Sequence, residues 1–364
     1  MEFCRVFPLL LLLLPLPHPI SDGKSVSTKP SHVDALFQDY ARRDAPGASV
    51  MVIKDGKVLF KKAYGLANLE EKTPCSTDTN YRLASLTKQF TAAAVMLLAE
   101  RKKLSYDATL TDLFPGFPAY GKQITVRHLL NHTSGLTDYE DLIPKETTAP
   151  LRDAQVLELL KRERGTYFQP GSKFQYSNSG YALLALIVEA TSHTSFASFL
   201  EENIFKPLGM RDTVAFENGV SVVKRRAYGY WKRADGSGGF VRKDQSLTSS
   251  VLGDGGVYSS VEDLYKWDQA LYTDRLLSRA SLAEAFTPGV RINEEGEGYG
   301  FGWFTATYRG HGTVWHYGST TGFRTAIERF PDERFTVIVL VNRNEADAHQ
   351  LARKLVDLYL FDAR

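Results

Sequence analysis

Strand-forming segments gather at the two ends of this chain of 364 residues, and this distribution constrains the fold more than any other feature. Near the N-terminus, residues 48–60 contain two β-rich runs around Asp55-Gly56, a dipeptide typical of tight hairpin turns. Near the C-terminus, β-rich runs separated by Gly or Pro-Asp turns predict strands over residues 300–308, 313–317, 324–330 and 335–341.

Helical patterns fill most of the chain between these strands, over residues 86–100, 154–161, 180–190 and 261–272, and a last amphipathic helix is predicted over residues 346–360. We expect an α+β fold in which an antiparallel sheet, built from both chain ends, is flanked by helices. A mostly helical subdomain is then inserted over roughly residues 78–290. A functional site is expected in a cleft where the sheet meets this subdomain.

Residues 1–23 have the pattern of a signal peptide. Arg5 precedes an apolar run with six consecutive leucines, and Ser21-Asp22-Gly23 provides small residues around a cleavage site. The run is too short to span a bilayer and is interrupted by prolines. We therefore expect export to the periplasm or the medium without stable membrane insertion, and one domain over residues 24–364.

Composition is that of a globular protein with a packed core, since 43% of the residues are hydrophobic. The 44 basic and 42 acidic residues nearly cancel, which argues against a nucleic-acid partner. Cys4 lies in the predicted leader, so Cys75 would be the only cysteine of an exported product. Such a product has no intramolecular disulfide and depends on its core for stability.

Ser85-Leu86-Thr87-Lys88 opens the first predicted helix. Residues three apart share a helix face, so the Ser85 hydroxyl and the Lys88 amine can meet. Free backbone N–H groups in the first turn would favour a developing oxyanion. Alone, the pattern is also that of a capping serine followed by a surface lysine.

Two further motifs change this interpretation. Tyr176-Ser177-Asn178 lies on a turn just before a predicted helix, and His316-Tyr317-Gly318 lies in a predicted strand. With these motifs in this order, the sequence resembles the serine β-lactamase-like family, which includes class C β-lactamases, DD-peptidases, D-aminopeptidases and family VIII carboxylesterases. The likeness covers roughly residues 33–343 and includes residues 129–136, 205–210 and 253–256. It implies the β-lactamase/transpeptidase-like form of the predicted fold.

The resemblance also implies roles for individual residues. Ser85 would be the nucleophile that forms an acyl-enzyme, and Lys88 and Tyr176 would relay protons. Asn178 would hydrogen-bond to Lys88 and to the substrate. The backbone N–H groups of Ser85 and Ser319 would form the oxyanion hole.

A serine hydroxyl needs a base to take its proton. An ordinary lysine, with a pKa near 10.4, is almost wholly charged at pH 7, so the pKa of Lys88 must fall for it to act as that base. Proton transfer through Tyr176 is the alternative, and the sequence leaves both open. No metal or organic cofactor is expected.

The third motif departs from the β-lactamases, which have Lys-Thr-Gly there. His316, with an ordinary pKa near 6.5, is mostly neutral at pH 7 and is a poor partner for a substrate carboxylate. Gly318 would let a substrate backbone approach closely. Tyr317 indicates an aromatic wall for apolar acyl groups, together with Trp303, Trp315 and Phe323, although aromatic residues are also common in strands.

We therefore expect a serine hydrolase acting on small-molecule substrates, most readily on short-chain esters. The alternatives are a D-Ala-D-Ala carboxypeptidase or a D-aminopeptidase/amidase, then a weak β-lactamase, and outside enzymes an inactive penicillin-binding-type module. The sequence does not indicate an oligomeric state.

Two other patterns are given structural interpretations. His128 and His132 are four apart, but no glutamate follows His128 as a zinc-protease motif requires, so His132 is interpreted as a helix-end residue. Gly253-Asp254-Gly255-Gly256 lacks the Lys-Ser or Lys-Thr of a phosphate-binding loop and is interpreted as a turn lining the cleft.

Overall fold

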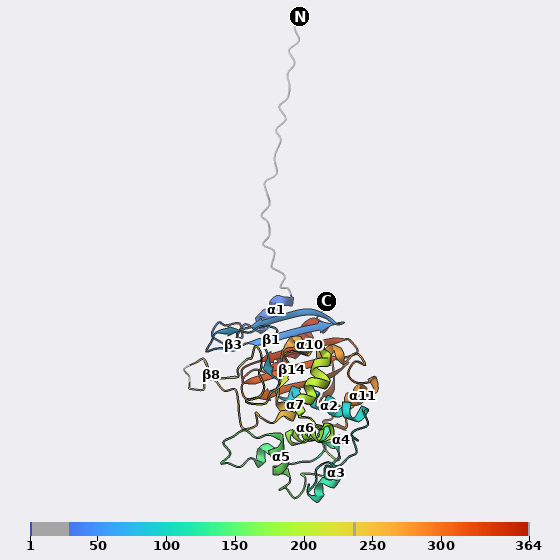
Figure 1. Ribbon diagram of the computed structural model, residues 1–364. Helices are drawn as coiled ribbons and strands as arrows, with labels where there is room; N and C mark the ends of the chain where they lie inside the picture. The colour runs from blue at the N-terminus through green and yellow to red at the C-terminus, as the bar shows by residue number, and fades with distance from the viewer. Residues whose placement is uncertain (2–28, 236–237, 363–364) are drawn as a thin grey trace.

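The computed structural model describes residues 1, 29–235 and 238–362, and its main feature is an eight-stranded antiparallel sheet made from both chain ends (Figure 1). Apart from Met1, the predicted signal peptide lies outside the described residues. The spatial order is β10-β11-β12-β13-β14-β15-β1-β2. These strands are β1 (Ala48–Lys54), β2 (Lys57–Tyr64), β10 (Val290–Arg291), β11 (Gly298–Tyr299), β12 (Phe304–Tyr308), β13 (His311–Thr320), β14 (Phe323–Phe330) and β15 (Phe335–Val341). The predicted α+β fold is confirmed.

The hairpin between β1 and β2 forms for the local reason that its sequence indicates. Asp55 and Gly56 both have positive φ, 50° and 72°, as a two-residue hairpin turn of this hand requires. β1 then pairs with β15 near the other end of the chain, with Val50 opposite Val339. This pairing joins strands from the two ends of the chain in one sheet.

Each face of the sheet packs against a separate hydrophobic cluster because successive strand side chains point in opposite directions. Val50 and Val52 face a cluster that includes Phe37, beside α1 (Lys29–Leu36), and Leu355 of α12 (Ala348–Val356). Met51 and Ile53 face the larger cluster, which includes α2 (Lys88–Glu100) and α10 (Val261–Ala270). The sheet is thus a layer between helices.

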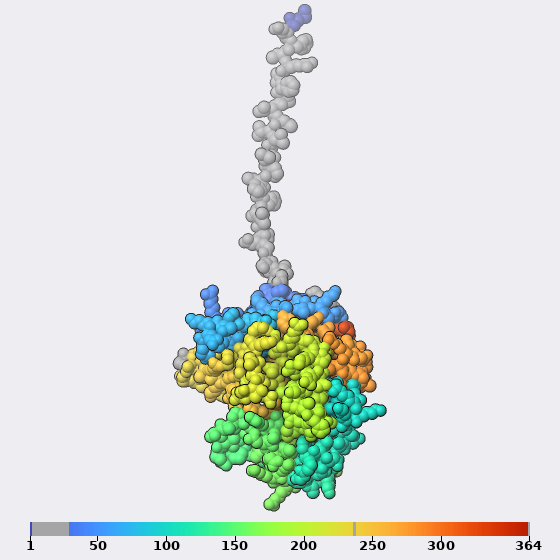
Figure 2. Space-filling view, viewed as in Figure 1, coloured from blue at the N-terminus to red at the C-terminus, as the bar shows by residue number. Residues whose placement is uncertain are grey.

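Helices dominate the chain between β2 and β10. The remaining ones are α3 (Leu110–Leu113), α4 (Val126–Leu130), α5 (Asp153–Leu160), α6 (Asn178–Ser192), α7 (Phe196–Leu200), α8 (Lys206–Leu208), α9 (Leu252–Gly255) and α11 (Arg279–Ala285). In Figure 2 the cyan and green segments form the end of the molecule opposite the blue N-terminal strands. Among the described residues no single helix is long and apolar enough to cross a bilayer. Two helical segments with a bend between them, Asn178–Ser192 and Phe196–Leu208, reach the required length and hydropathy only when they are taken together.

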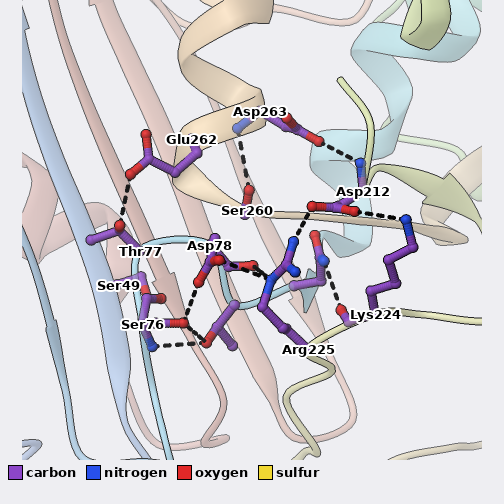
Figure 3. Close-up of polar contacts among 12 residues, drawn as sticks. Ser49, Ser76, Thr77, Asp78, Asp212, Lys224, Arg225, Ser260, Glu262 and Asp263 are labelled. Carbon is purple, nitrogen blue, oxygen red and sulfur yellow. Dashed lines mark hydrogen bonds and ion pairs between the residues drawn. The ribbon is translucent and has the colours of Figure 1, made fainter. Parts of the chain in front are cut away.

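Three small sheets lie beside this helical part. Their strands are β3 (Leu66–Asn68) with β4 (Thr73–Pro74), β5 (Tyr81–Arg82) with β9 (Val257–Ser259) and β6 (Val214–Ala215), and β7 (Tyr230–Lys232) with β8 (Phe240–Arg242). A polar network fixes the loop before β5 (Figure 3). In it, Arg225 contacts both Asp78 and Asp212, and the backbone N–H of Asp212 donates to Asp263 at 3.0 Å. Arg225 therefore joins the loop before β5 to the segment around Asp212.

Two predicted elements differ in detail from the structure. The predicted strand 300–308 is shortened to β12 (Phe304–Tyr308), because Gly302 turns the chain with a φ of 81° and lies directly against the backbone of Lys88. The predicted turn at residues 253–256 is largely the short helix α9. Both differences arise where the chain packs against the start of α2.

Candidate active site

Ser85 lies in a single 3₁₀ turn, η1 (Ala84–Thr87), which runs directly into α2. The preceding residue, Ala84, has a φ of 51°, a left-handed conformation that costs about 1–2 kcal/mol for a residue other than glycine. This sharp bend between β5 and η1 leaves Ser85 partly exposed while its neighbours Ala84 and Leu86 are buried. The serine is thus presented at the edge of a packed core.

Lys88 is fully buried, and its amine has three hydrogen-bond acceptors. Nζ lies 3.1 Å from Ser85 Oγ, 2.9 Å from Asn178 Oδ1 and 2.9 Å from the backbone oxygen of Asp254. Burial lowers the pKa of Lys88 to about 8, and the charge of Asp254 opposes the shift in part. Two of the three acceptors cannot donate a proton, so a neutral amine would direct its lone pair toward Ser85.

Asn178 is held in the orientation that Lys88 needs. Its Nδ2 atom donates to Glu140 at 3.2 Å, which leaves Oδ1 to accept from Lys88. Asn178 is also the first residue of α6, and the Ser177 side chain caps that helix by accepting from Gly180. The start of α6 therefore sets the position of the amide.

The third predicted residue, Tyr176, lies beside the same amine. Lys88 Nζ is 4.8 Å from the centre of the Tyr176 ring. The phenol oxygen is buried and has no hydrogen-bond partner among the described residues. Burial raises the pKa of Tyr176 well above its usual value, and the neighbouring Ser85 hydroxyl opposes this shift. The structure thus brings Ser85, Lys88 and Tyr176 together.

His316 lies in β13, is 1% exposed and is neutral. Its Nδ1 atom lies 2.7 Å from the backbone oxygen of Tyr317. Because that oxygen can only accept, Nδ1 carries the proton, and Nε2 accepts from the Tyr299 hydroxyl at 3.0 Å. Burial and the nearby Lys88 charge lower the pKa of His316 to about 3. The His316 side chain is therefore an uncharged hydrogen-bond partner of Tyr299 and not a cation.

Gly318 is required for a reason different from the one expected. A Cβ atom there would lie 2.2 Å from the backbone oxygen of Leu83 and 2.3 Å from Thr325 Oγ1. The missing side chain thus lets β13 pack against the segment that carries Ser85, and not against a substrate. Ser319, the next residue, is exposed beside Ser85 in the same pocket.

The pocket at Ser85 is small, with a volume of about 40 Å³, and has a polar lining. Its walls include Arg82, Ala84, Ser85, Glu140, Asn178, Thr248, Asp254, Gly255, Ser319 and Thr320. Arg82 is buried and donates to the backbone oxygens of Ser249 and Gly255 at 2.9 and 3.2 Å. The Arg82 guanidinium is thus occupied by hydrogen bonds within the protein. Glu140, in contrast, is an exposed residue.

Two buried acids behind Lys88 were not identified from the sequence. Asp254 accepts from the Tyr139 hydroxyl at 2.9 Å, and burial raises its pKa to about 6. Asp153 accepts from the backbone N–H groups of Leu252 and Gly253, and burial raises its pKa to about 7. Asp153 thus fixes α9, whose Asp254 carbonyl holds Lys88. The glycines around Asp254 were the only signal available.

The four aromatic residues expected to form a wall are divided between the surface and the core. Trp315 and Tyr317 stack on each other, with ring centres 5.8 Å apart, and both stack on Phe304. Tyr317 is 45% exposed. Trp303 packs on Phe286 and Phe323 packs on Tyr258, so these two belong to the core, as does the buried Trp315.

Comparison with known proteins agrees with this geometry. The family model described as Beta-lactamase matches residues 33–360. The chain belongs to the beta-lactamase family. Within this family the chain is a serine hydrolase, and Ser85 is the serine that the described structure places against a buried lysine.

The chain is similar to proteins that are named as a penicillin-binding protein, a D-aminopeptidase and a D-amino acid amidase. Penicillin-binding protein 4* of Bacillus subtilis is 35% identical over 89% of this chain and 74% of its own length. A D-aminopeptidase of Brucella anthropi is 31% identical over 86% of this chain, which spans only 59% of that enzyme. The D-amino acid amidase structure from Ochrobactrum anthropi, complexed with D-phenylalanine, has a TM-score of 0.77 and 25% identity, covering 93% of this chain and 100% of the amidase.

Proposed function

We propose that this chain hydrolyses small esters by forming an acyl-enzyme on Ser85. The observation that carries the proposal is the 3.1 Å contact between Ser85 Oγ and Lys88 Nζ, with the other two N–H directions of Lys88 taken by Asn178 and Asp254. An activated serine needs a base within hydrogen-bond reach, and this amine meets that requirement.

Lys88 is a better ground-state base than Tyr176. The pKa of Lys88 is lowered to about 8, so a useful fraction is neutral near pH 7, whereas burial keeps the Tyr176 phenol protonated. Lys88 takes the hydroxyl proton as Ser85 Oγ bonds to the acyl carbon. The proton then passes to the leaving-group oxygen through Tyr176, as the ester bond breaks. Water repeats the sequence and releases the acid.

The oxyanion formed in both steps would be bound by the backbone N–H groups of Ser85 and Ser319. Support comes from the packing of Gly318 against Leu83, which places β13 beside the start of η1. Such donors typically contribute about 10²- to 10³-fold to kcat.

Esters are favoured over β-lactams and carboxyl-terminal peptides because the described residues that line the pocket offer no free cation for a substrate carboxylate. His316 is neutral, and Arg82 donates to backbone oxygens. The exposed Tyr317 ring, stacked on Trp315, provides an apolar surface for the acyl group.

A second candidate is hydrolysis of amides or peptides with a free α-amino group. The observation that favours it is Glu140, a carboxylate on the pocket wall that faces Ser85 across Asn178. An ammonium group bound there would lie near the scissile carbonyl. The aminopeptidase and amidase names of the relatives support this candidate.

A substrate panel tests both candidates. The panel comprises p-nitrophenyl butyrate, D-alanine p-nitroanilide, its N-acetylated form, a diacetylated Lys-D-Ala-D-Ala peptide and a cephalosporin, each measured with the wild type and with Ser85→Ala. We expect the ester to have the highest kcat/KM and Ser85→Ala to lose it. A cephalosporin as the best substrate, or retained activity in Ser85→Ala, would refute the proposal.

Glu140→Gln isolates the second candidate, because glutamine keeps the acceptor for Asn178 and removes the charge. If Glu140 binds an ammonium group, this variant lowers kcat/KM about tenfold for D-alanine p-nitroanilide and leaves the N-acetylated substrate unchanged. Equal effects on both anilides would exclude this role for Glu140.

A further inference from the structure

His132 contacts the chain on both sides of Tyr176. Its backbone oxygen accepts from the N–H of Gln175 at 2.9 Å, and its Nδ1 atom accepts from the N–H of Ser177 at 3.1 Å. A single residue from the end of α4 therefore fixes the two residues that flank the phenol. Ser177 in turn caps α6, where Asn178 begins.

The ring of His132 also packs on the ring of Tyr176, with centres 4.3 Å apart. The centres of the Tyr299 and Tyr181 rings lie 4.4 Å and 5.0 Å from the centre of the His132 ring. The phenol oxygen of Tyr176 has no hydrogen-bond partner in the described part of the chain. Ring packing and the backbone contacts of its neighbours therefore hold the Tyr176 side chain in place beside Lys88.

The state of the imidazole fits this arrangement. Because Nδ1 accepts a hydrogen bond, the proton is on Nε2, which is buried and has no partner among the described residues. Burial, with the nearby charge of Lys88, lowers the pKa of His132 well below its usual value. His132 thus stays neutral and adds no second positive charge beside Lys88.

The backbone of His132 has an unusual conformation as well, with a φ of 59° in a residue that is 0% exposed. Left-handed conformations of residues other than glycine are costly and are often retained at functional sites. Here the conformation lets the backbone oxygen and the side chain of His132 contact both neighbours of Tyr176.

We propose that His132 is a positioning residue for Tyr176 in the acyl-transfer reaction. The proposal rests on the proposed function, in which Tyr176 passes a proton to the leaving group. His132 does not touch the substrate; it sets the place of the phenol and, through Ser177, the start of α6.

A double-mutant cycle tests this proposal, with rates normalised to the active sites counted by a fluorophosphonate. His132→Asn keeps an oxygen near the Nδ1 position and tolerates positive φ, but it removes the ring. We expect it to lower the acylation rate about tenfold with KM unchanged within twofold, and His132→Ala to lower it about a hundredfold.

Combined with Tyr176→Phe, His132→Asn should cause no further loss, because the residue acts through the phenol hydroxyl. His128→Asn is the matched control: its Nδ1 also accepts a backbone N–H, from Thr125 at 3.3 Å, and its rate should match the wild type.

Multiplicative losses in the double variant, or an unchanged acylation rate in His132→Asn, would overturn the proposal. If His132→Ala does not fold, the cycle with the asparagine variant still decides the question. The proposed function fails separately, through retained activity in Ser85→Ala.

Discussion

Lys88 Nζ lies 2.9 Å from the Oδ1 atom of Asn178, although the two residues are 90 positions apart in the chain. The amide accepts from the amine without adding charge, while burial lowers the pKa of Lys88 to about 8. This contact connects the start of α2 with the start of α6 and joins two of the three sequence motifs.

The first prediction concerns pH. If neutral Lys88 is the base, kcat/KM for an ester should be low below pH 7, rise with pH and level off above a midpoint near 8. In Asn178→Asp a carboxylate beside the amine stabilises its charged form, so the midpoint should move to higher pH. Rate profiles from pH 5 to 10 measure both, and a rate that does not change between pH 6 and 9 would contradict this role of Lys88.

The second prediction separates the role of Tyr176 in catalysis from any role in stability. Tyr176→Phe should lower kcat by about 10²- to 10⁴-fold for an alkyl ester such as ethyl butyrate, because its alkoxide leaving group loses its proton donor. Stability should not fall, since the hydroxyl is buried without a partner among the described residues. Urea unfolding and steady-state kinetics on the same preparation test both points; a large loss of stability with intact kcat would reverse the interpretation.

The third prediction concerns Gly318. Gly318→Ala places a Cβ atom against backbone that cannot easily move, so the free energy of unfolding should fall by about 1–3 kcal/mol, with reduced activity. Gly312→Ala is the control in the same strand, because, apart from its chain neighbours, no atom of the described residues lies within 4 Å of its added Cβ. Equal stability of the two variants, measured by urea unfolding, would show that the close packing of β13 on Leu83 is unimportant.

The fourth prediction concerns a buried ion pair that joins α10 to the sheet. Arg329 Nε lies 2.6 Å from Asp268 Oδ1, and neither side chain is exposed. Asp268→Ala should cost about 3–5 kcal/mol, because it leaves a buried guanidinium without its partner. The exposed pair of Arg42 and Asp44 offers a comparison, and Asp44→Ala should leave the unfolding midpoint unchanged.

The fold was predictable where local chemistry decides it. Asp55-Gly56 specifies a hairpin by itself, and the apolar run at residues 335–341 coincides with β15. The ends of strands were harder to predict where they depend on packing. β12 begins only at Phe304 because Gly302 turns against Lys88, and no local pattern encodes that contact.

The candidate site was predictable to the extent that motifs name residues. Ser85, Lys88, Tyr176 and Asn178 meet as the resemblance implies. The supporting residues were not predictable, because their contacts span distant parts of the chain. Asp153 holds α9 across about 100 residues, and His132 reads in the sequence only as the end of a helix.

The central claim is that Ser85 carries the acyl group, and mass spectrometry of the trapped intermediate tests it most directly. The protein is quenched in acid within milliseconds of mixing with p-nitrophenyl butyrate, and the intact mass and peptide map are recorded. The account predicts a butyryl group on the peptide that contains Ser85, at no more than one per chain, and none in Ser85→Ala. An acyl group on another residue, with Ser85 unmodified during turnover, would contradict it.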